Sequence, residues 1–351
     1  MIKFVVIFLF IFQSLFATEI LYLSSVDGID VKQVGQNGEL KKIQSLSIVN
    51  AGPIAISPDK KFLYTATRNK KLIELISCSI ADDGTLKLLK KVKINAYPSY
   101  LLTDKTGQYL TGSHYREGTA SIWALNKGVY EGTISDQLKL EQKAHAVMFS
   151  ADNKFLFVPA TGPNKIFQHH FDVHSGKTKA NDKPFAEGPK SGAMQPRHMI
   201  FHPSAHIAYS TLERTKPGVG IWQWSPEKGQ LTFLESITLA DTSETFLTTA
   251  DLHMTSNKKF LYVSLRDKKA KENQIFAFKI LEDGKLNLIK GFPCEHIPRS
   301  FCLSQNDKFL YVAGQGDAKL GVYKVEDSGE LSKVKQYNVG QKPTWVTTIT
   351  K

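Results

Sequence analysis

The sequence predicts an all-β fold, and three observations support that prediction. First, short runs rich in β-branched and aromatic residues alternate with Gly, Asn and Asp, and no long stretch has convincing helical periodicity. Second, one phrase recurs along the chain: an apolar strand, a polar turn, and a strand with an aromatic-Leu-Tyr pattern, as in PIAISPDKKFLYTAT and HAVMFSADNKFLFVPA. Third, the copies of this phrase are about 46 to 53 residues apart.

The repeat indicates both the kind of fold and the number of its units. Six copies align on Leu63, Leu110, Leu156, Ala208, Leu261 and Leu310. Each copy continues into a third and a fourth strand, and four strands per repeat of this length are typical of a β-propeller blade. EILYLSS near the N-terminus resembles the second half of a seventh copy, and QKPTWVTTITK at the C-terminus resembles its first half. We therefore expect a seven-bladed β-propeller of four-stranded antiparallel blades, closed by pairing of the terminal strands so that no sheet edge is left open.

The N-terminus has the pattern of a secretory signal peptide. A lysine at position 3 precedes an apolar run from Phe4 to Phe16, and the small residue Ala17 follows. The run is short for a bilayer span. We expect residues 1–17 to be the signal peptide and residues 18–351 to be a single propeller domain that is exported, to the periplasm or outside the cell. An uncleaved anchor is the alternative, and without a working leader the protein would be cytoplasmic.

Composition and charge exclude several classes of function. The chain has 351 residues and a formal net charge of +12, but its lysines are scattered at expected turns, so we expect no nucleic-acid partner. Three cysteines are too few for a disulfide framework and fit buried small side chains. No zinc-ligand spacing, calcium-binding run or phosphate-cradling glycine loop occurs, so we expect neither a metal nor a cofactor. We expect no stable membrane association after signal cleavage, and the oligomeric state is left open.

Blade geometry predicts where a functional site would lie. The first strand of a blade is innermost, and a hairpin joins it to the second strand, so the start of strand one and the end of strand two lie on the same face around the channel. Counting back eleven positions from the aligned residues, and forward five, selects polar side chains at these strand ends: His145, Arg197, Glu213, Asp251 beside Ala250, Arg266, Arg299 and Gln315. Guanidinium groups grip carboxylate or phosphate, and imidazole and carboxylate groups move protons. We expect an anion-binding site with proton-transfer groups.

Several phrases resemble those of a known family at matching order and spacing. QPRHMIFHP, ADLHMTSNKKFLYVSLRD, IPRSFCLSQNDKFLYVAGQ and YNVGQKPTWV are similar to the seven-bladed lactonase family, which includes bacterial propeller-type 6-phosphogluconolactonase and the fungal carboxy-cis,cis-muconate cyclase. The resemblance implies a channel site of one His, one Glu and two Arg. Matched phrase by phrase, the implied catalytic residues are His145, Glu213, Arg197 and Arg266. Arg299 and Gln315 would be secondary substrate contacts, and blade geometry adds Asp251.

The resemblance implies a lactonase that hydrolyses an anionic sugar lactone, such as 6-phosphogluconolactone, or a related lactone. His145 or Glu213 would be the general base for the attacking water, and an arginine would stabilise the oxyanion. Two alternatives are left open. A muconate-type cyclase or isomerase would use the same groups on a different substrate, and a non-catalytic exported propeller would bind anionic ligands or proteins with the arginines alone. The export signal conflicts with a cytoplasmic sugar phosphate as substrate.

Overall fold

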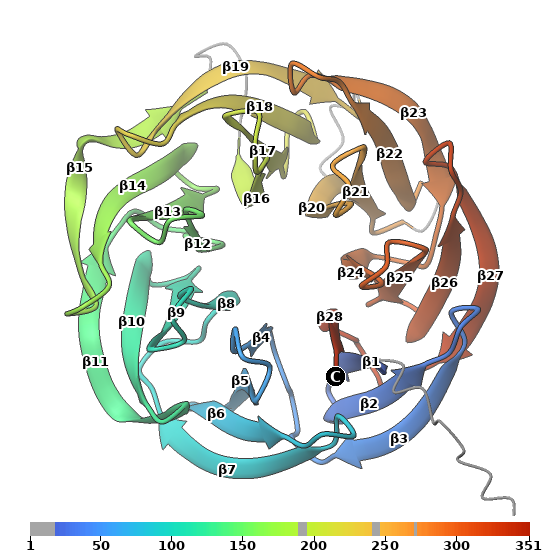
Figure 1. Cartoon of the computed structure of the whole chain (residues 1–351), viewed down its shortest axis with the longest axis horizontal. Coiled ribbons are helices and arrows are strands. Elements are labelled where there is room, and N and C mark those ends of the chain that lie inside the picture. The colour runs from blue at the N-terminus through green and yellow to red at the C-terminus, as the bar shows by residue number, and fades with distance from the viewer. Residues whose placement is uncertain (1–17, 189–194, 241–245, 270–271) are drawn as a thin grey trace, which may run out of the picture.

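The computed structural model describes residues 18–188, 195–240, 246–269 and 272–351. Within these ranges the chain forms seven four-stranded antiparallel sheets, which are arranged around a central axis like the blades of a propeller (Figure 1). The expected all-β, seven-bladed fold is therefore confirmed. No helix in the described ranges is long and apolar enough to cross a membrane. The predicted signal peptide, residues 1–17, lies outside the described residues.

Every blade has the same strand order, from the channel to the rim. The innermost strands are β28 (Trp345–Thr350), β4 (Ile54–Ile56), β8 (Tyr100–Thr103), β12 (Met148–Phe149), β16 (Pro196–Phe201), β20 (Leu247–Met254) and β24 (Pro298–Leu303). The second strands are β1 (Glu19–Ser24), β5 (Phe62–Asn69), β9 (Tyr109–His114), β13 (Phe155–Ala160), β17 (Ile207–Leu212), β21 (Phe260–Asp267) and β25 (Phe309–Gly314).

The two outer strands of each blade complete the sheet. The third strands are β2 (Ile29–Val34), β6 (Leu72–Ile80), β10 (Thr119–Asn126), β14 (Lys165–Asp172), β18 (Gly218–Ser225), β22 (Gln274–Ile280) and β26 (Lys319–Val325). The rim strands are β3 (Leu40–Leu46), β7 (Leu86–Lys93), β11 (Val129–Lys139), β15 (Lys177–Glu187), β19 (Gln230–Thr238), β23 (Leu286–Pro293) and β27 (Leu331–Asn338).

The ring closes as the split seventh copy predicts. The C-terminal strand β28 is the innermost strand of the blade that begins with β1, and the two pair antiparallel from Glu19↔Thr350 to Ser24↔Trp345. Thr18 and Lys351 extend the pairing with two backbone hydrogen bonds, each 2.9 Å long. Within the described residues, the first blade is therefore built from both ends of the chain, from Thr18 to Lys351.

The core lies between the blades. All six residues used to align the repeat are fully buried, in the second strands. Each packs in a cluster that joins neighbouring blades: Leu63 lies in one cluster with Tyr22, and Leu261 in another with Tyr209. Second strands such as β25 are buried on both faces, whereas the rim strand β27 is mostly exposed. The aromatic-Leu-Tyr phrase is thus the packing layer between blades.

Tyrosines of the repeat also tie each blade to a turn of the next one. Four of their hydroxyl groups donate to a glycine carbonyl in the outer hairpin of the following blade. The pairs are Tyr22–Gly84 at 2.8 Å, Tyr64–Gly128 at 2.8 Å, Tyr209–Gly284 at 2.7 Å and Tyr262–Gly329 at 3.0 Å. These glycines have φ between +79° and +86°, which other residues rarely adopt. The glycine turns, which are Asp-Gly, Lys-Gly, Asp-Gly and Ser-Gly in chain order, therefore help to set the spacing between blades.

The three cysteines are unbridged, as the sequence indicates: Cys78 and Cys302 are buried, and Cys294 is half-buried.

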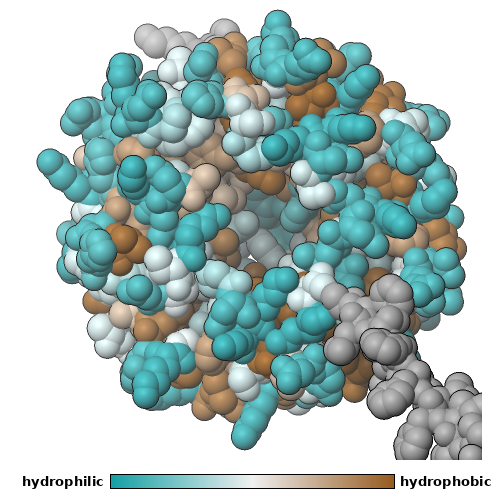
Figure 2. Space-filling view, in the orientation of Figure 1, coloured by the Kyte–Doolittle hydropathy of each residue, from teal (hydrophilic) through white to brown (hydrophobic). Residues whose placement is uncertain are grey.

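The central channel is visible as a hollow in the middle of the disc in the space-filling view, and mostly hydrophilic residues surround it (Figure 2).

Candidate active site

A pocket of about 410 Å³ opens at the channel face where inner strands begin and second strands end. Its described lining residues come from six blades. They are Arg68, Tyr97, Ser99, Tyr115, Arg116, His145, Glu213, Arg214, Thr248, Arg266, Lys268, Ile297, Arg299 and Gln315. Six of these side chains are cationic and one is a carboxylate. The volume lies within the range of small-molecule sites.

The hairpins between first and second strands bring these side chains together. In blade six, Thr248 at the start of β20 pairs with Arg266 near the end of β21. In the next blade, Pro298 at the start of β24 pairs with Gly314 at the end of β25, which places Arg299 and Gln315 at the same face. His145 occupies this position just before β12, where its backbone N–H donates to the Pro159 carbonyl. Repetition of one hairpin around the axis thus builds the pocket.

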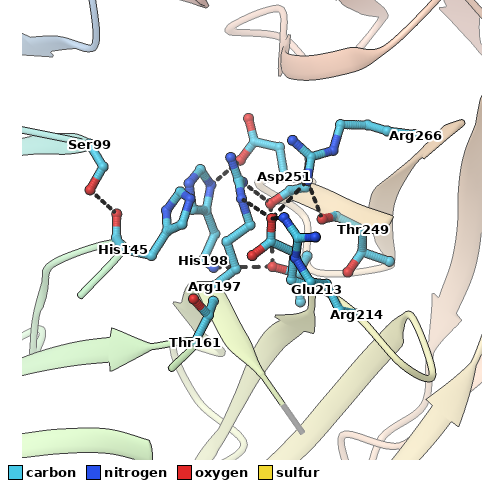
Figure 3. Close-up of polar contacts among 12 residues, drawn as sticks. Ser99, His145, Thr161, Arg197, His198, Glu213, Arg214, Thr249, Asp251 and Arg266 are labelled. Carbon is cyan, nitrogen blue, oxygen red and sulfur yellow. Dashed lines mark hydrogen bonds and ion pairs between the residues drawn. The ribbon is translucent and has the colours of Figure 1, made fainter. Parts of the chain in front are cut away.

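Glu213 is the centre of the cationic cluster (Figure 3). Arg266 Nη2 donates to its Oε1 at 3.0 Å and also to the Thr249 carbonyl at 3.2 Å. Arg214 Nη2 lies 3.8 Å and Arg197 Nε 4.0 Å from the same oxygen. Burial raises the pKa of Glu213, but the neighbouring arginines outweigh burial, and its pKa is lowered overall. Glu213 is therefore ionised at neutral pH and holds Arg266 in place.

Arg197 lies beneath the pocket and does not line it. Its side chain is 1% exposed, and Nη1 donates to the Ala250 carbonyl. Burial and the nearby Arg266 and Arg299 hold its pKa well below the usual value. Arg197, which we expected at the channel mouth, is not among the described residues that line this pocket, although its Nε lies 4.0 Å from Glu213 Oε1.

His145 is buried and neutral. Its side chain lines the pocket but is only 4% exposed as a residue, and its Nδ1 is buried without a hydrogen-bond partner among the described residues. Burial, followed by the charges of Arg197 and neighbouring groups, lowers its pKa well below 6.5. An imidazole that stays unprotonated beside arginines can accept a proton at neutral pH.

Asp251 lies outside the pocket, in a second cavity of about 230 Å³ further along the inner strands. The two cavities share none of their described lining residues. Asp251, which we expected at the mouth, is one position further along its strand than the aligned residue Ala250, and it is not among the described residues that line the pocket. Asp251 instead meets His198, which has the same offset in β16.

Five of the seven selected residues share the pocket: His145, Glu213, Arg266, Arg299 and Gln315. The selection missed Tyr97, Arg116, Arg214 and Lys268, which also line it. Arg116, Arg214 and Lys268 follow a second-strand end by one or two positions, so extending the forward count would have found them.

Within the described ranges, no group of three or more His, Cys, Asp and Glu side chains is arranged to hold a metal ion.

Comparison with known proteins agrees with this architecture. Residues 21–348 match the family model described as Lactonase, 7-bladed beta-propeller. The chain belongs to the seven-bladed β-propeller lactonase family. The 6-phosphogluconolactonase of Enterobacter sp. (strain 638) is 30% identical over 325 residues, covering 91% of this chain and 94% of the relative. The 6-phosphogluconolactonase of Cronobacter sakazakii is 33% identical over 301 residues, covering 84% and 86%.

A solved structure has the same fold. The periplasmic gluconolactonase of Pseudomonas aeruginosa superimposes with a TM-score of 0.85 at 22% identity, covering 95% of this chain and 99% of that one. The lactonase family and the enzymatic nature of the chain, a lactone hydrolase, are therefore established by sequence similarity, and the fold by structural similarity as well.

The cationic lining predicts that the pocket binds small anions. We take inorganic phosphate as the probe and assume a Kd of about 1 mM. At about 20 mM, phosphate then raises the free energy of unfolding by about 1.8 kcal/mol through mass action. This raises Tm by a few degrees. Arg299→Ala should abolish most of this rise in Tm, because the pocket loses a guanidinium group that can hold the phosphate through two hydrogen bonds. Thermal melts with and without phosphate measure it.

The control is Lys87→Ala, which removes an exposed cation from the rim strand β7 and should leave the phosphate effect unchanged. Equal loss of the effect in both variants would mean that phosphate acts through overall charge and that the pocket is not an anion site.

Proposed function

We propose that this lactonase hydrolyses a sugar lactone that carries an anionic group, and that the reaction takes place in the arginine-rich pocket. The observation that carries the proposal is the combination of one neutral histidine with a surplus of fixed cations in a single pocket. Cations alone would suffice for an anion-binding protein. A buried, unprotonated imidazole beside them adds what hydrolysis needs, a proton acceptor.

Arg299 and Arg68 are the groups we assign to the anion of the substrate. Both line the pocket and are half-buried, so that solvent screens them only in part. Arg68 also lies over the Tyr97 ring, 4.8 Å from its centroid, which orients the guanidinium. The exposed Arg116 and Lys268 at the rim would attract the anion before it docks. A phosphate or carboxylate group fits this charge pattern.

The remaining groups fit the chemistry of ester hydrolysis. His145 takes a proton from water as the water oxygen bonds to the lactone carbonyl carbon. Arg266 stabilises the oxyanion that forms, and Glu213 orients Arg266 through their 3.0 Å hydrogen bond. The tetrahedral intermediate then collapses, the ring C–O bond breaks, and His145 returns the proton to the departing alkoxide. The product is an open-chain hydroxy acid. Because Glu213 is already engaged by Arg266, this scheme gives the base role to His145.

A panel of lactones tests this function. We expect hydrolysis of phosphorylated sugar lactones with a higher kcat/KM than their unphosphorylated counterparts, and no turnover of muconolactones, as followed by acid release. His145→Ala and Glu213→Ala should lower kcat by about 10² or more while KM changes little, because both act on the transition state.

Three results would contradict the proposal. Preferred turnover of muconolactones would favour the cyclase or isomerase alternative. Ligand binding without turnover of any lactone would favour a binding protein. Turnover within threefold of the wild type in both alanine variants would remove His145 and Glu213 from the mechanism.

The pH dependence of kcat/KM tests the state of His145. Because its pKa in the folded protein is lowered, the imidazole stays unprotonated when the pH falls through 6.5. We expect kcat/KM at pH 5.5 to stay close to its value at pH 7.5. A histidine base of ordinary pKa would lose about tenfold over this interval. An acid limb centred near pH 6.5 would show that His145 is not the base, or that it is not desolvated when substrate binds.

Export is part of the proposal. Residues 1–17 have the signal-peptide pattern, and Thr18 already pairs with Lys351 in the first blade. Cleavage after Ala17 would leave the whole propeller intact. The similar Pseudomonas aeruginosa structure is named as a periplasmic protein. An exported enzyme would act outside the cytoplasm, on a sugar lactone there that carries a phosphate or carboxylate group.

Expression of the full-length chain in a bacterial host checks the leader. We expect the protein in the periplasmic or secreted fraction, with a mass that corresponds to an N-terminus at Thr18. A variant without residues 2–17 should stay in the cytoplasm. Full-length, uncleaved protein in the cytoplasm would contradict export, and uncleaved protein in the membrane fraction would indicate a retained anchor.

A further inference from the structure

A buried His198–Asp251 pair lies directly behind His145, and the mechanism above gives it no role. His198 Nδ1 and Asp251 Oδ1 are 2.8 Å apart, and both side chains are more than nine-tenths buried. The pair joins two inner strands, β16 and β20, in the second cavity. Buried ionisable pairs are costly unless geometry and hydrogen bonds compensate for the lost hydration.

The surroundings of Asp251 keep it ionised. Its Oδ1 accepts a hydrogen bond from the Leu252 amide at 3.1 Å, and its Oδ2 lies 3.4 Å from His253 Nε2. Burial raises the pKa of Asp251, but contacts with His253 and His198 outweigh burial and hold it well below its usual value. An ionised carboxylate only accepts hydrogen bonds. The nitrogen of His198 that faces it, Nδ1, must therefore carry the proton.

His198 is neutral, so its other nitrogen has a free lone pair. Burial, and then the charge of Arg197, lowers the pKa of His198 to about 4. With the proton on Nδ1, Nε2 is an acceptor, and it is buried without a hydrogen-bond partner among the described residues. The ring is held edge-on against Tyr100, with centroids 5.0 Å apart, and it also contacts Trp345 at 5.9 Å. The orientation of this lone pair is thus fixed by packing.

The neighbour of His198 on the pocket side is His145. The two rings meet edge to face, with centroids 5.4 Å apart, and they lie side by side in Figure 3. The buried nitrogen of His145 is Nδ1, which also has no partner among the described residues. Two unpartnered ring nitrogens, one on each of two adjoining buried imidazoles, therefore lie between the pocket and Asp251.

We propose that Asp251 and His198 are positioning residues that set the tautomer of His145. Asp251 fixes the proton of His198 on Nδ1, and the Nε2 lone pair of His198 favours a proton on Nδ1 of His145. The lone pair of His145 is then on Nε2, the nitrogen able to meet a water molecule in the pocket. When His145 accepts the proton of that water, the Asp251 carboxylate offsets the new positive charge among Arg197, Arg266 and Arg299. The catalytic part of this inference rests on the proposed function.

The ¹⁵N chemical shifts of the imidazole nitrogens test the tautomers without any substrate. In ¹⁵N-labelled wild-type protein we expect His198 and His145 each to carry the proton on Nδ1. In Asp251→Leu no acceptor faces His198 Nδ1, so the proton should no longer be held on that nitrogen and the His145 shifts should change. A proton on Nε2 of His198 in the wild type would overturn the proposal whatever the activity is.

Kinetics of the same variant test the consequence. Asp251→Leu nearly keeps the size of the side chain but removes the acceptor, and we expect kcat to fall about tenfold or more, with KM within about threefold, because His145 is then no longer held in the reactive tautomer. A purely structural role would lower Tm and leave kcat per folded molecule unchanged, which would also overturn the proposal.

A matched pair of substitutions separates His198 from a histidine outside this cluster. His198→Phe and His170→Phe each replace an imidazole with a phenyl ring, and His170 is an exposed residue of the third strand β14, against Phe155 at 5.1 Å. We expect His198→Phe to lower kcat about tenfold or more and His170→Phe to leave it within about threefold. Equal effects would contradict the proposal. If no lactone is turned over, the proposed function fails, and the ¹⁵N shifts still decide the tautomers.

Discussion

The antiparallel pairing of β1 with β28 is the contact on which the rest of the molecule depends. The pocket takes its described lining from six blades, and its members are up to about 250 residues apart in the chain, from Arg68 to Gln315. No local segment can bring them together. Only a closed ring places the starts of the inner strands around one axis, and closure requires that the last strand of the chain join the first blade. Inter-blade contacts of the Tyr22–Gly84 kind then fix the distance between neighbouring blades.

Closure of the ring also brings several arginines close enough to repel one another. Arg197, Arg266 and Arg299 are brought near one another, and each lowers the proton affinity of the groups around it. Glu213 compensates part of this charge through contacts with three arginines. His145 responds by staying neutral. The repulsion among these arginines destabilises the fold while the pocket holds no anion. The same repulsion keeps His145 unprotonated beside groups that can bind anions.

The sequence predicts the ring and most of the site because both follow from one repeat. A fixed count from the buried anchor residues reaches His145, Arg299 and Gln315 correctly, since the inner hairpins keep nearly constant length. The count does not predict how deep a side chain lies: Arg197 is at the counted position but is buried and does not line the pocket, and Asp251 is one position beyond the counted Ala250. Burial of a charged side chain at a strand end leaves no signature in the alternation of apolar residues. Arg116 and Lys268 were missed because they lie one or two positions beyond the ends of their second strands, where the count stopped. The His198–Asp251 contact joins two blades and becomes visible only in three dimensions.

Arg197 has one more consequence. Together with the rings of His145 and His198, it occupies the layer between the two cavities, which have no described lining residue in common. The pocket and the second cavity are therefore separate among the described residues. In the proposed reaction the lactone and the hydroxy acid made from it would both pass the exposed Arg116 and Lys268 at the rim of the pocket, so the cations that attract the substrate would also slow the release of the product carboxylate.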